Sequence, residues 1–188
     1  MKKLLTIAFL SILTLLIMTN KNHAAPAGIY DPENILFIET KYGRVVIELM
    51  PRVAPKHVER IKTLARRGFY DNIVFHRVID GFMAQTGDPT GTGTGGSDLP
   101  DLKAEFSDEP HLRGTVSMAR AASPNSANSQ FFIVTKDSRF LDGQYTVFGR
   151  VIEGMEFVDK LQKGYGPNGM VQNPDKMLKV RVARDVRN

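Results

Sequence analysis

The 188-residue sequence contains no cysteine. The fold therefore depends on its apolar core and not on disulfide bonds. The four histidines, His23, His57, His76 and His111, have no thiolate partner and lack the spacing typical of metal ligands. We therefore expect no metal ion and no cofactor, and we interpret His76, which lies within an apolar run, as a structural residue.

A phosphate-binding loop of the Gly-Lys-Ser/Thr type is also missing. Residues 91–96 formally match the Gly-x-Gly-x-x-Gly fingerprint of dinucleotide-binding proteins. That fingerprint works only between a buried strand and the N-terminus of a helix, and residues 88–90 and 97–100 on either side resemble neither. We therefore interpret residues 91–96 as a surface loop and expect no nucleotide to bind there.

The charge of the chain gives no indication of nucleic-acid binding. The formal net charge of the whole sequence is +5, but Lys2, Lys3 and Lys21 fall within the first 27 residues. Without these three lysines the net charge falls to +2, and the remaining basic residues are scattered among acidic ones. A basic stripe typical of a nucleic-acid interface is absent from this pattern.

The first 27 residues have the layout of a secretory signal peptide. A short basic start is followed by an apolar run over residues 4–18, which is shorter than the roughly 20 residues of a membrane-spanning helix. Small residues favour cleavage after Ala27, with Ala24 as the alternative site and an uncleaved membrane anchor as the competing interpretation. We expect an exported protein, periplasmic if the source is Gram-negative, with no membrane attachment after cleavage and a single domain over residues 28–188.

The pattern after the leader predicts two helices among about eight short strands. Gly and Pro punctuate the chain between runs rich in β-branched and aromatic residues. Helices are expected from Pro55 to just before Gly68 and over 155–163, and strands over 35–40, 44–49, 73–79, 82–86, 115–119, 130–135, 146–152 and 178–186. This succession favours an antiparallel barrel or sandwich with helices covering its ends.

Residues 75–88 hold one arginine, one glutamine, one methionine and several large apolar side chains around Gly81. Strand alternation places Phe75, Arg77 and Ile79 on one face. The same rule groups Met83 with Gln85, and Gln130 with Phe132 and Val134. No general base can be assigned to Ser117 or Ser129, so the sequence gives no indication of bond-breaking chemistry. The arginine, the glutamines and the apolar side chains of these strand faces suit a pocket with a fixed hydrogen-bond donor instead.

Three ordered blocks of sequence resemble the cyclophilins, the peptidyl-prolyl isomerases that interconvert cis and trans X–Pro bonds. The first block is residues 75–88, the second combines residues 114–121 with 128–133, and the third combines residues 141–143 with 147–151. The resemblance covers residues 35–186, almost the whole chain after the leader. It implies a mainly β fold, a closed eight-stranded antiparallel β-barrel capped by two α-helices.

The resemblance also implies roles for individual residues. Arg77 would be the catalytic arginine and Gln85 would act with it in catalysis, while Gln85 and Gln130 would also be polar substrate contacts. The proline pocket would be formed by Phe82, Met83, Phe132 and Leu141, the groove for the substrate backbone by Ala119, Arg120 and Ala121, and the rim by Phe140 and Tyr145. Strict alternation would point Phe82 away from Met83, so both can reach one pocket only if the chain is irregular at Gly81.

The chain departs from the cyclophilin pattern on the rim of this site. Phe140 stands where many eukaryotic relatives carry tryptophan, Tyr145 where many carry histidine, and Arg120 where asparagine is common. The tryptophan helps to bind the drug cyclosporin, and phenylalanine has no indole N–H donor, so we expect weakened cyclosporin binding. The expected partners are proline-containing polypeptides, chiefly exported proteins that are still folding, and the expected state is a monomer. The alternative function is a non-catalytic module that binds proline peptides on the same fold.

Overall fold

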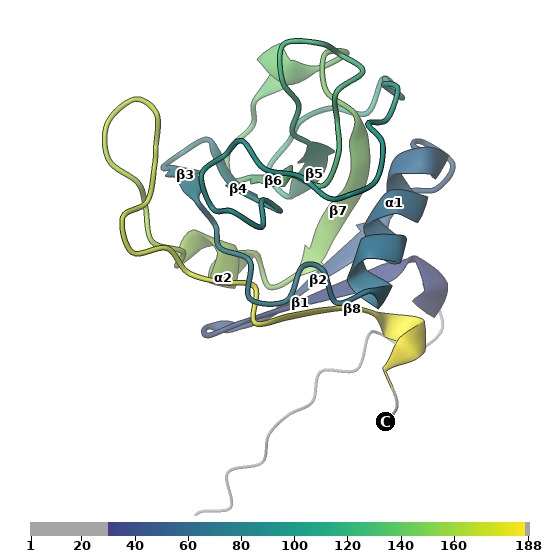
Figure 1. Cartoon of the computed structure of the whole chain (residues 1–188), viewed down its shortest axis with the longest axis horizontal. Coiled ribbons are helices and arrows are strands. Elements are labelled where there is room, and N and C mark those ends of the chain that lie inside the picture. The colour runs from purple at the N-terminus through teal and green to yellow at the C-terminus, as the bar shows by residue number, and fades with distance from the viewer. Residues whose placement is uncertain (1–29, 187–188) are drawn as a thin grey trace, which may run out of the picture.

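The computed structural model describes residues 30–186, which form one curled β-sheet with two α-helices (Figure 1). The helices are α1 (Pro55–Arg66) and α2 (Met155–Asp159). The eight strands are β1 (Ile35–Thr40), β2 (Gly43–Leu49), β3 (Arg77–Ile79), β4 (Met83–Thr86), β5 (Thr115–Met118), β6 (Phe131–Val134), β7 (Val147–Glu153) and β8 (Lys179–Val182). Three short 3-10 helices complete the fold: η1 (Pro32–Asn34), η2 (Arg139–Leu141) and η3 (Ala183–Asp185).

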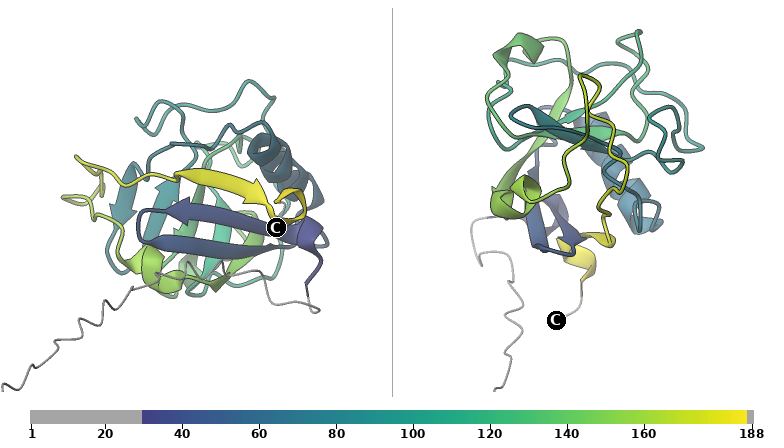
Figure 2. Two further views of the ribbon diagram at one scale, coloured as in Figure 1. Left: turned by 90° about the horizontal axis from the view of Figure 1, so that it is seen from below. Right: turned by 90° about the vertical axis from the view of Figure 1, so that its left-hand side faces the viewer.

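All neighbouring strands are antiparallel, in the order β3-β4-β6-β5-β7-β2-β1-β8. The sheet is strongly curled, as the two views of Figure 2 show. Ahead of β3 and β8, the amide N–H of Asn72 donates to the carbonyl of Met177 at 2.7 Å, and that of Phe75 donates to the carbonyl of Asp175 at 2.8 Å. The expected mainly β fold of eight antiparallel strands with two helices is thus confirmed. The strands form a curled half-barrel, because the edge strands β3 and β8 do not pair with each other and only irregular chain ahead of them is hydrogen-bonded.

The main core lies inside the curl, beneath α1. Val58, Ile61 and Leu64 are at most 1% exposed and come from one face of this helix, as the spacing of its apolar residues predicts. They pack against inward-facing residues of the sheet such as Ile38 and Ile133. Among the described residues, no helix is long and apolar enough to cross a membrane.

Several elements are shorter than the sequence predicts. The expected strand over 73–79 is paired as β3 only from Arg77, because residues 72–75 instead bond to residues 175–177. The predicted helix over 155–163 ends as α2 at Asp159, and the expected strand over 178–186 ends as β8 at Val182, where η3 begins. The predicted signal peptide lies outside the described residues.

The shift at the start of β3 corrects one sequence-based expectation. Phe75 was expected to share a face with Arg77 and Ile79, but its side chain is 2% exposed and packs in the main core. Ile79 instead packs with a separate apolar cluster on the other side of the sheet. The alternation fails because residues 73–76 are not part of a regular strand, so their side chains do not follow the period of two.

Candidate active site

The turn between β3 and β4 brings two successive apolar residues into one cluster. Gly81 has φ 65°, a left-handed conformation that glycine adopts without steric strain, and the Phe82 N–H donates to the Ile79 carbonyl at 3.1 Å. This turn lets Phe82 and Met83 pack in the same apolar cluster. The irregularity expected at Gly81 is therefore present, and it overrides the alternation that would separate the two side chains.

This cluster, which we call the pocket cluster, contains all four residues expected to hold a proline ring. Its buried members are Met83, Phe132, Val134 and Leu141, and its partly buried neighbours include Phe82, Ala119 and Tyr145. Strand pairing places Met83 opposite Val134 and Gln85 opposite Phe132, so β4 and β6 present their side chains on a common face. Leu141 comes from η2, a segment remote in sequence from these strands.

The guanidinium of Arg77 is held beside the pocket cluster by two contacts. Arg77 lies opposite Gln85 in the β3–β4 ladder, and its Nη1 donates to Oε1 of Gln85 at 3.2 Å. Its Nε donates to the carbonyl oxygen of Asn168 at 2.8 Å. Burial lowers the pKa of Arg77 below its ordinary value, but an arginine remains charged at neutral pH. Among the described residues, Nη2 has no hydrogen-bond acceptor, so the fork keeps donors for another molecule.

A chain of amide side chains connects Arg77 with the glycine-rich loop over 91–96. Nε2 of Gln85 donates to Oε1 of Gln130 at 2.9 Å. Nε2 of Gln130 donates in turn to the carbonyls of Gly93 and Gly95 at 3.1 and 2.8 Å. Each amide is therefore fixed in one orientation, which also fixes the oxygen that faces Arg77.

The glycine-rich loop is a surface loop, as expected, and Asp88 holds it in place. Oδ2 of Asp88 accepts hydrogen bonds from the backbone N–H groups of Gly93 and Gly95 at 2.6 and 3.1 Å, and Oδ1 accepts one from that of Thr90 at 2.7 Å. Burial alone would raise the pKa of Asp88, but a hydrogen bond from the Thr90 hydroxyl and these backbone hydrogen bonds outweigh it and lower the pKa to about 2. Asp88 therefore organises the loop as an anion at neutral pH.

Beside this loop runs an open groove of about 530 Å³. Its lining includes five residues predicted to contact substrate, and these are Gln85, Ala119, Arg120, Ala121 and Gln130. The loop residues 93–97 line it as well. The groove can thus accept an extended chain that continues away from the pocket cluster.

Aromatic and cationic side chains form the rim. The ring of Phe140 lies 5.5 Å from that of Phe82, centroid to centroid, and its side chain is 66% exposed. The guanidinium carbon of Arg120 lies 4.6 Å from the ring centroid of Tyr145. Arg120 also donates to the carbonyl oxygens of Gln144 and Ala121, so it is held against the rim.

Beneath the pocket cluster, the structure brings together a serine, a histidine and an aspartate that sequence reasoning did not connect. Nε2 of His111 lies 3.0 Å from Oγ of Ser117, and Nδ1 of His111 lies 3.1 Å from Oδ1 of Asp142. Ser117 and His111 have no exposed surface, and the Ser117 hydroxyl also reaches the Thr146 carbonyl at 2.9 Å. A substrate carbonyl cannot reach this hydroxyl, so the three residues do not form a hydrolase triad.

Their position supports the pocket instead. The His111 ring stacks on Phe132 with 6.2 Å between centroids and 18° between planes. Burial lowers the pKa of His111 below its ordinary value, whereas the backbone N–H of His111 is the main cause that lowers the pKa of Asp142 to about 2. His76 is also buried, as expected, and burial lowers its pKa as well. No group of three or more His, Asp or Glu side chains within residues 30–186 is arranged to hold a metal ion.

Two contributions to the site were missed from the sequence. One is the Asn168 carbonyl, which accepts from Arg77 although the two residues are 91 positions apart. The other is the His111 ring below Phe132. Every residue has a backbone carbonyl, so the residue type at position 168 could not indicate the contact with Arg77. The apolar pattern around His111 is too short to predict that its ring packs against Phe132.

Such a site can hold a polypeptide and direct donors at its amide, and no exposed nucleophile–base pair occurs in the described part of the chain. It defines a protein that binds polypeptides non-covalently. Residues 35–183 match the family model described as cyclophilin type peptidyl-prolyl cis-trans isomerase/CLD, and the chain belongs to this family. Its activity is therefore peptidyl-prolyl cis-trans isomerisation, as the sequence motifs predicted.

Relatives of the chain carry the same description. A probable peptidyl-prolyl cis-trans isomerase of Brucella suis is 53% identical over 173 residues, which cover 86% of this chain and 88% of the relative. Among solved structures, a cyclophilin from Hirschia baltica is 32% identical with a TM-score of 0.75 and covers 84% of this chain and 77% of its own. A cyclophilin type isomerase of Cryptosporidium parvum, solved in the presence of the dipeptide Ala-Pro, is 31% identical with a TM-score of 0.73, covering 79% and 98%.

Proposed function

We propose that the substrates of this isomerase are exported polypeptides that fold outside the cytoplasm, and that Arg77 and Gln85 are its catalytic residues. The layout of the first 27 residues, typical of a secretory signal, supports the export of the protein. Uncatalysed X–Pro isomerisation takes tens to hundreds of seconds, which is slow enough to limit folding. An isomerase in that compartment would remove this delay.

The proposed mechanism uses the difference between a planar and a twisted amide. The barrier to rotation, about 18–20 kcal/mol, comes from the partial double-bond character of the peptide bond. When the bond is twisted, the proline nitrogen loses conjugation and becomes a better hydrogen-bond acceptor. A donor from Arg77 placed at this nitrogen binds the twisted form more tightly than the planar form, and such differential binding lowers the barrier.

The remaining predicted residues would position the substrate. We assign the proline ring to Phe82, Met83, Phe132 and Leu141, the neighbouring chain to Ala119, Arg120, Ala121 and Gln130, and the rim to Phe140 and Tyr145. The Cryptosporidium parvum relative was solved with an Ala-Pro dipeptide, which supports proline-containing peptides as ligands here. Gln85 would orient Arg77 through the hydrogen bond that joins them.

The observation that carries these assignments is the Arg77 guanidinium, fixed by Gln85 and Asn168 beside the pocket cluster. We expect Arg77→Ala to lower kcat/KM for a proline tetrapeptide about a hundredfold or more, the usual loss when a transition-state donor is removed. NMR exchange spectroscopy between the cis and trans forms measures this rate without a coupled protease.

Arg184→Ala is the matched control, because Arg184 lies on η3 and makes only an exposed ion pair with Asp31. It should leave the rate unchanged, and both variants should keep the melting temperature of the parent within a few degrees. An Arg77→Ala variant with full activity would contradict the assignment. Peptide binding without acceleration in the parent protein would favour the non-catalytic binding module.

The export proposal has its own test. N-terminal sequencing of the protein recovered from its source should start at Gly28, or at Ala25 if cleavage follows Ala24. We expect this species outside the cytoplasm, in the periplasm of a Gram-negative source. Light scattering should show that it is a monomer. Recovery of a membrane-bound chain that still starts at Met1 would support the anchored form instead.

A further inference from the structure

The face that carries Arg77 continues beyond β3 onto a hairpin over residues 164–170. This hairpin projects from the sheet on the left of Figure 1 and faces the viewer in the right-hand view of Figure 2. It pairs with β3, since the Val78 N–H donates to the Gly169 carbonyl at 2.8 Å and the Gly164 N–H donates to the Val78 carbonyl at 2.9 Å. The hairpin therefore extends the edge of the sheet next to the site.

The register of this pairing sets which side chains share the face of Arg77. Met170 lies opposite Arg77, and Tyr165 lies opposite Met170. Residues directly opposite one another in an antiparallel pair point to the same face. A single cross-strand row therefore runs from Phe132 through Gln85 and Arg77 to Met170 and Tyr165.

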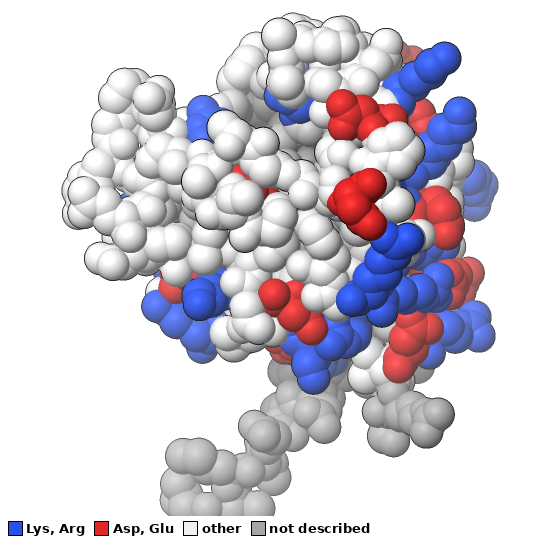
Figure 3. Space-filling model, in the orientation of Figure 1, with Lys and Arg blue, Asp and Glu red and all other residues white. Residues whose placement is uncertain are grey.

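Unlike the first part of this row, its outer end is open to solvent. Tyr165 is 72% exposed and Met170 is 42% exposed, and because they are paired across the hairpin they place adjoining apolar surface in solvent. Residues 164–174 carry no charge, and the side of the molecule where the hairpin projects is correspondingly white in Figure 3. The pocket cluster and the uncharged hairpin thus lie on opposite sides of Arg77.

We propose that Met170 and Tyr165 form a substrate subsite that receives an apolar side chain of the polypeptide two or three residues from the proline. Adjacent strands lie about 4.8 Å apart, which places Tyr165 about 10 Å beyond Arg77, and an extended chain advances about 3.3 Å per residue. The occupant is the polypeptide held in the neighbouring site, because the subsite continues that surface without a break. The inference rests on the proposed placement of the proline beside Arg77.

The test compares peptides that share an Ala-Pro core and alanine elsewhere, with either leucine or serine placed at the second or the third position on either side of the proline. The parent protein should show a higher kcat/KM for leucine than for serine at one or more of these positions. The double variant Tyr165→Ser with Met170→Ser should lose this preference, through a fall of about three- to tenfold for the leucine peptides alone. Its rate with the all-alanine peptide should stay within about twofold of the parent.

Val186→Ser is the matched control, because Val186 is a 38% exposed apolar side chain at the far end of the chain, after η3. It should keep the leucine preference. If the ratio of kcat/KM between the leucine and serine peptides is unchanged in the double variant, the subsite is overturned. An equal loss of kcat/KM with every peptide would also overturn it, because it would indicate a displaced Arg77. Failure of the proposed catalytic role is distinguishable, because it would appear as an active Arg77→Ala variant with the all-alanine peptide.

Discussion

Single side chains on the rim decide which hydrogen-bond donors this isomerase can offer to a ligand there. Phe140 is exposed and tilted at 37° against Phe82, so a larger ring with a donor could occupy the same position. Tyr145 contacts Phe132 edge-on and is covered by Arg120, which fixes the opposite rim. Phe140 therefore gives the rim no hydrogen-bond donor, while the four residues expected to hold a proline ring lie together in the pocket cluster.

At this scale we predict that Phe140→Trp strengthens inhibition by cyclosporin. An indole N–H adds one neutral hydrogen bond, worth about 1 kcal/mol or about fivefold in affinity. Inhibition constants from the exchange assay measure the change. Phe106→Trp, at another exposed phenylalanine, is the control and should leave inhibition unchanged. Equal inhibition of the parent and Phe140→Trp would show that the missing donor does not limit binding.

A second prediction at the residue scale concerns Asp88. Its folded pKa of about 2 lies below the ordinary carboxyl value, so its contribution to stability is present above about pH 4 and is lost as the pH falls toward 2. Asp88→Asn should therefore lower the free energy of unfolding at pH 7 and much less at pH 2. Urea denaturation at both pH values measures this, with Asp80→Asn at an exposed site as the control. A deficit that is equal at both pH values would contradict the role of the charge.

At the scale of elements, α1 depends on a residue from a distant loop. Its N-cap is Ala54, which offers no side-chain acceptor. Glu105 replaces that acceptor, because its carboxylate accepts from the backbone N–H groups of Lys56 and His57 at 3.1 Å and lies 2.7 Å from Nδ1 of His57. A negative charge at a helix N-terminus is also favoured by the helix dipole. The loop and the helix therefore stabilise one another.

We predict that Glu105→Ala lowers the free energy of unfolding by about 1–2 kcal/mol, the usual loss for a helix cap. Glu105→Gln should lose less, because its amide oxygen still accepts from the backbone while the charge is absent. Urea denaturation and the melting temperature measure both changes. Glu109→Ala, which removes a surface contact to Arg150, should have little effect. Equal stability of all three variants would show that α1 needs no cap from this loop.

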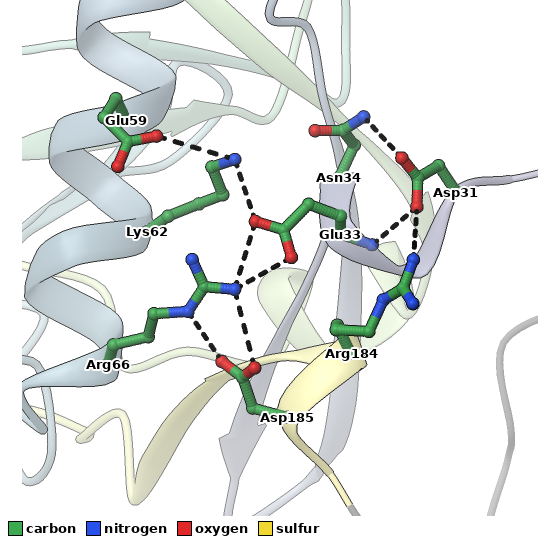
Figure 4. Close-up of polar contacts among 8 residues, drawn as sticks. All are labelled: Asp31, Glu33, Asn34, Glu59, Lys62, Arg66, Arg184 and Asp185. Atoms are coloured by element: carbon green, nitrogen blue, oxygen red, sulfur yellow. Dashed lines mark hydrogen bonds and ion pairs between the residues drawn. The ribbon is translucent and has the colours of Figure 1, made fainter.

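At the scale of the whole molecule, the two ends of the described chain meet on α1 (Figure 4). Nη2 of Arg66 donates to Glu33 of η1 at 2.8 Å, and Nε of Arg66 donates to Asp185 of η3 at 2.8 Å. Lys62 adds a 3.0 Å contact to Glu33. One turn of helix thus ties together η1 and η3, which lie more than 150 positions apart, next to the paired strands β1 and β8.

This network predicts a pH-dependent part of the stability. Hydrogen bonds from Arg66 and Lys62 lower the pKa of Glu33, so its contribution is present above the ordinary carboxyl value of about 4.5 and is lost as the pH falls below it. Arg66→Met should lower the free energy of unfolding by about 1 kcal/mol at pH 7 and by less at pH 3. Urea denaturation avoids the screening that guanidinium salts would add. Arg52→Met, at an exposed arginine, is the control, and a deficit independent of pH would contradict the prediction.

Much of the fold could be predicted from the sequence. Alternation placed Met83 with Gln85 and Phe132 with Val134, and the pairing of β4 with β6 has this arrangement. The irregularity at Gly81 was also expected, because without it Phe82 could not join Met83. Alternation failed for Phe75, where the chain bonds to residues 175–177 before β3 begins. Whether a run forms a regular strand depends on its pairing partner, and that partner lies a hundred positions away.

The sequence by itself determined the family and the faces of the paired strands, because these follow from contiguous motifs and from local periodicity. The residues of the pocket cluster followed from the resemblance that those motifs carry. Only the tertiary structure decided that the Asn168 carbonyl orients Arg77, that His111 stacks beneath Phe132, and that Met170 and Tyr165 continue the row of Arg77. Each of these contacts depends on how the sheet curls and which edges it brings together. That geometry arises from the packing of the whole core, so no local pattern of residues encodes it.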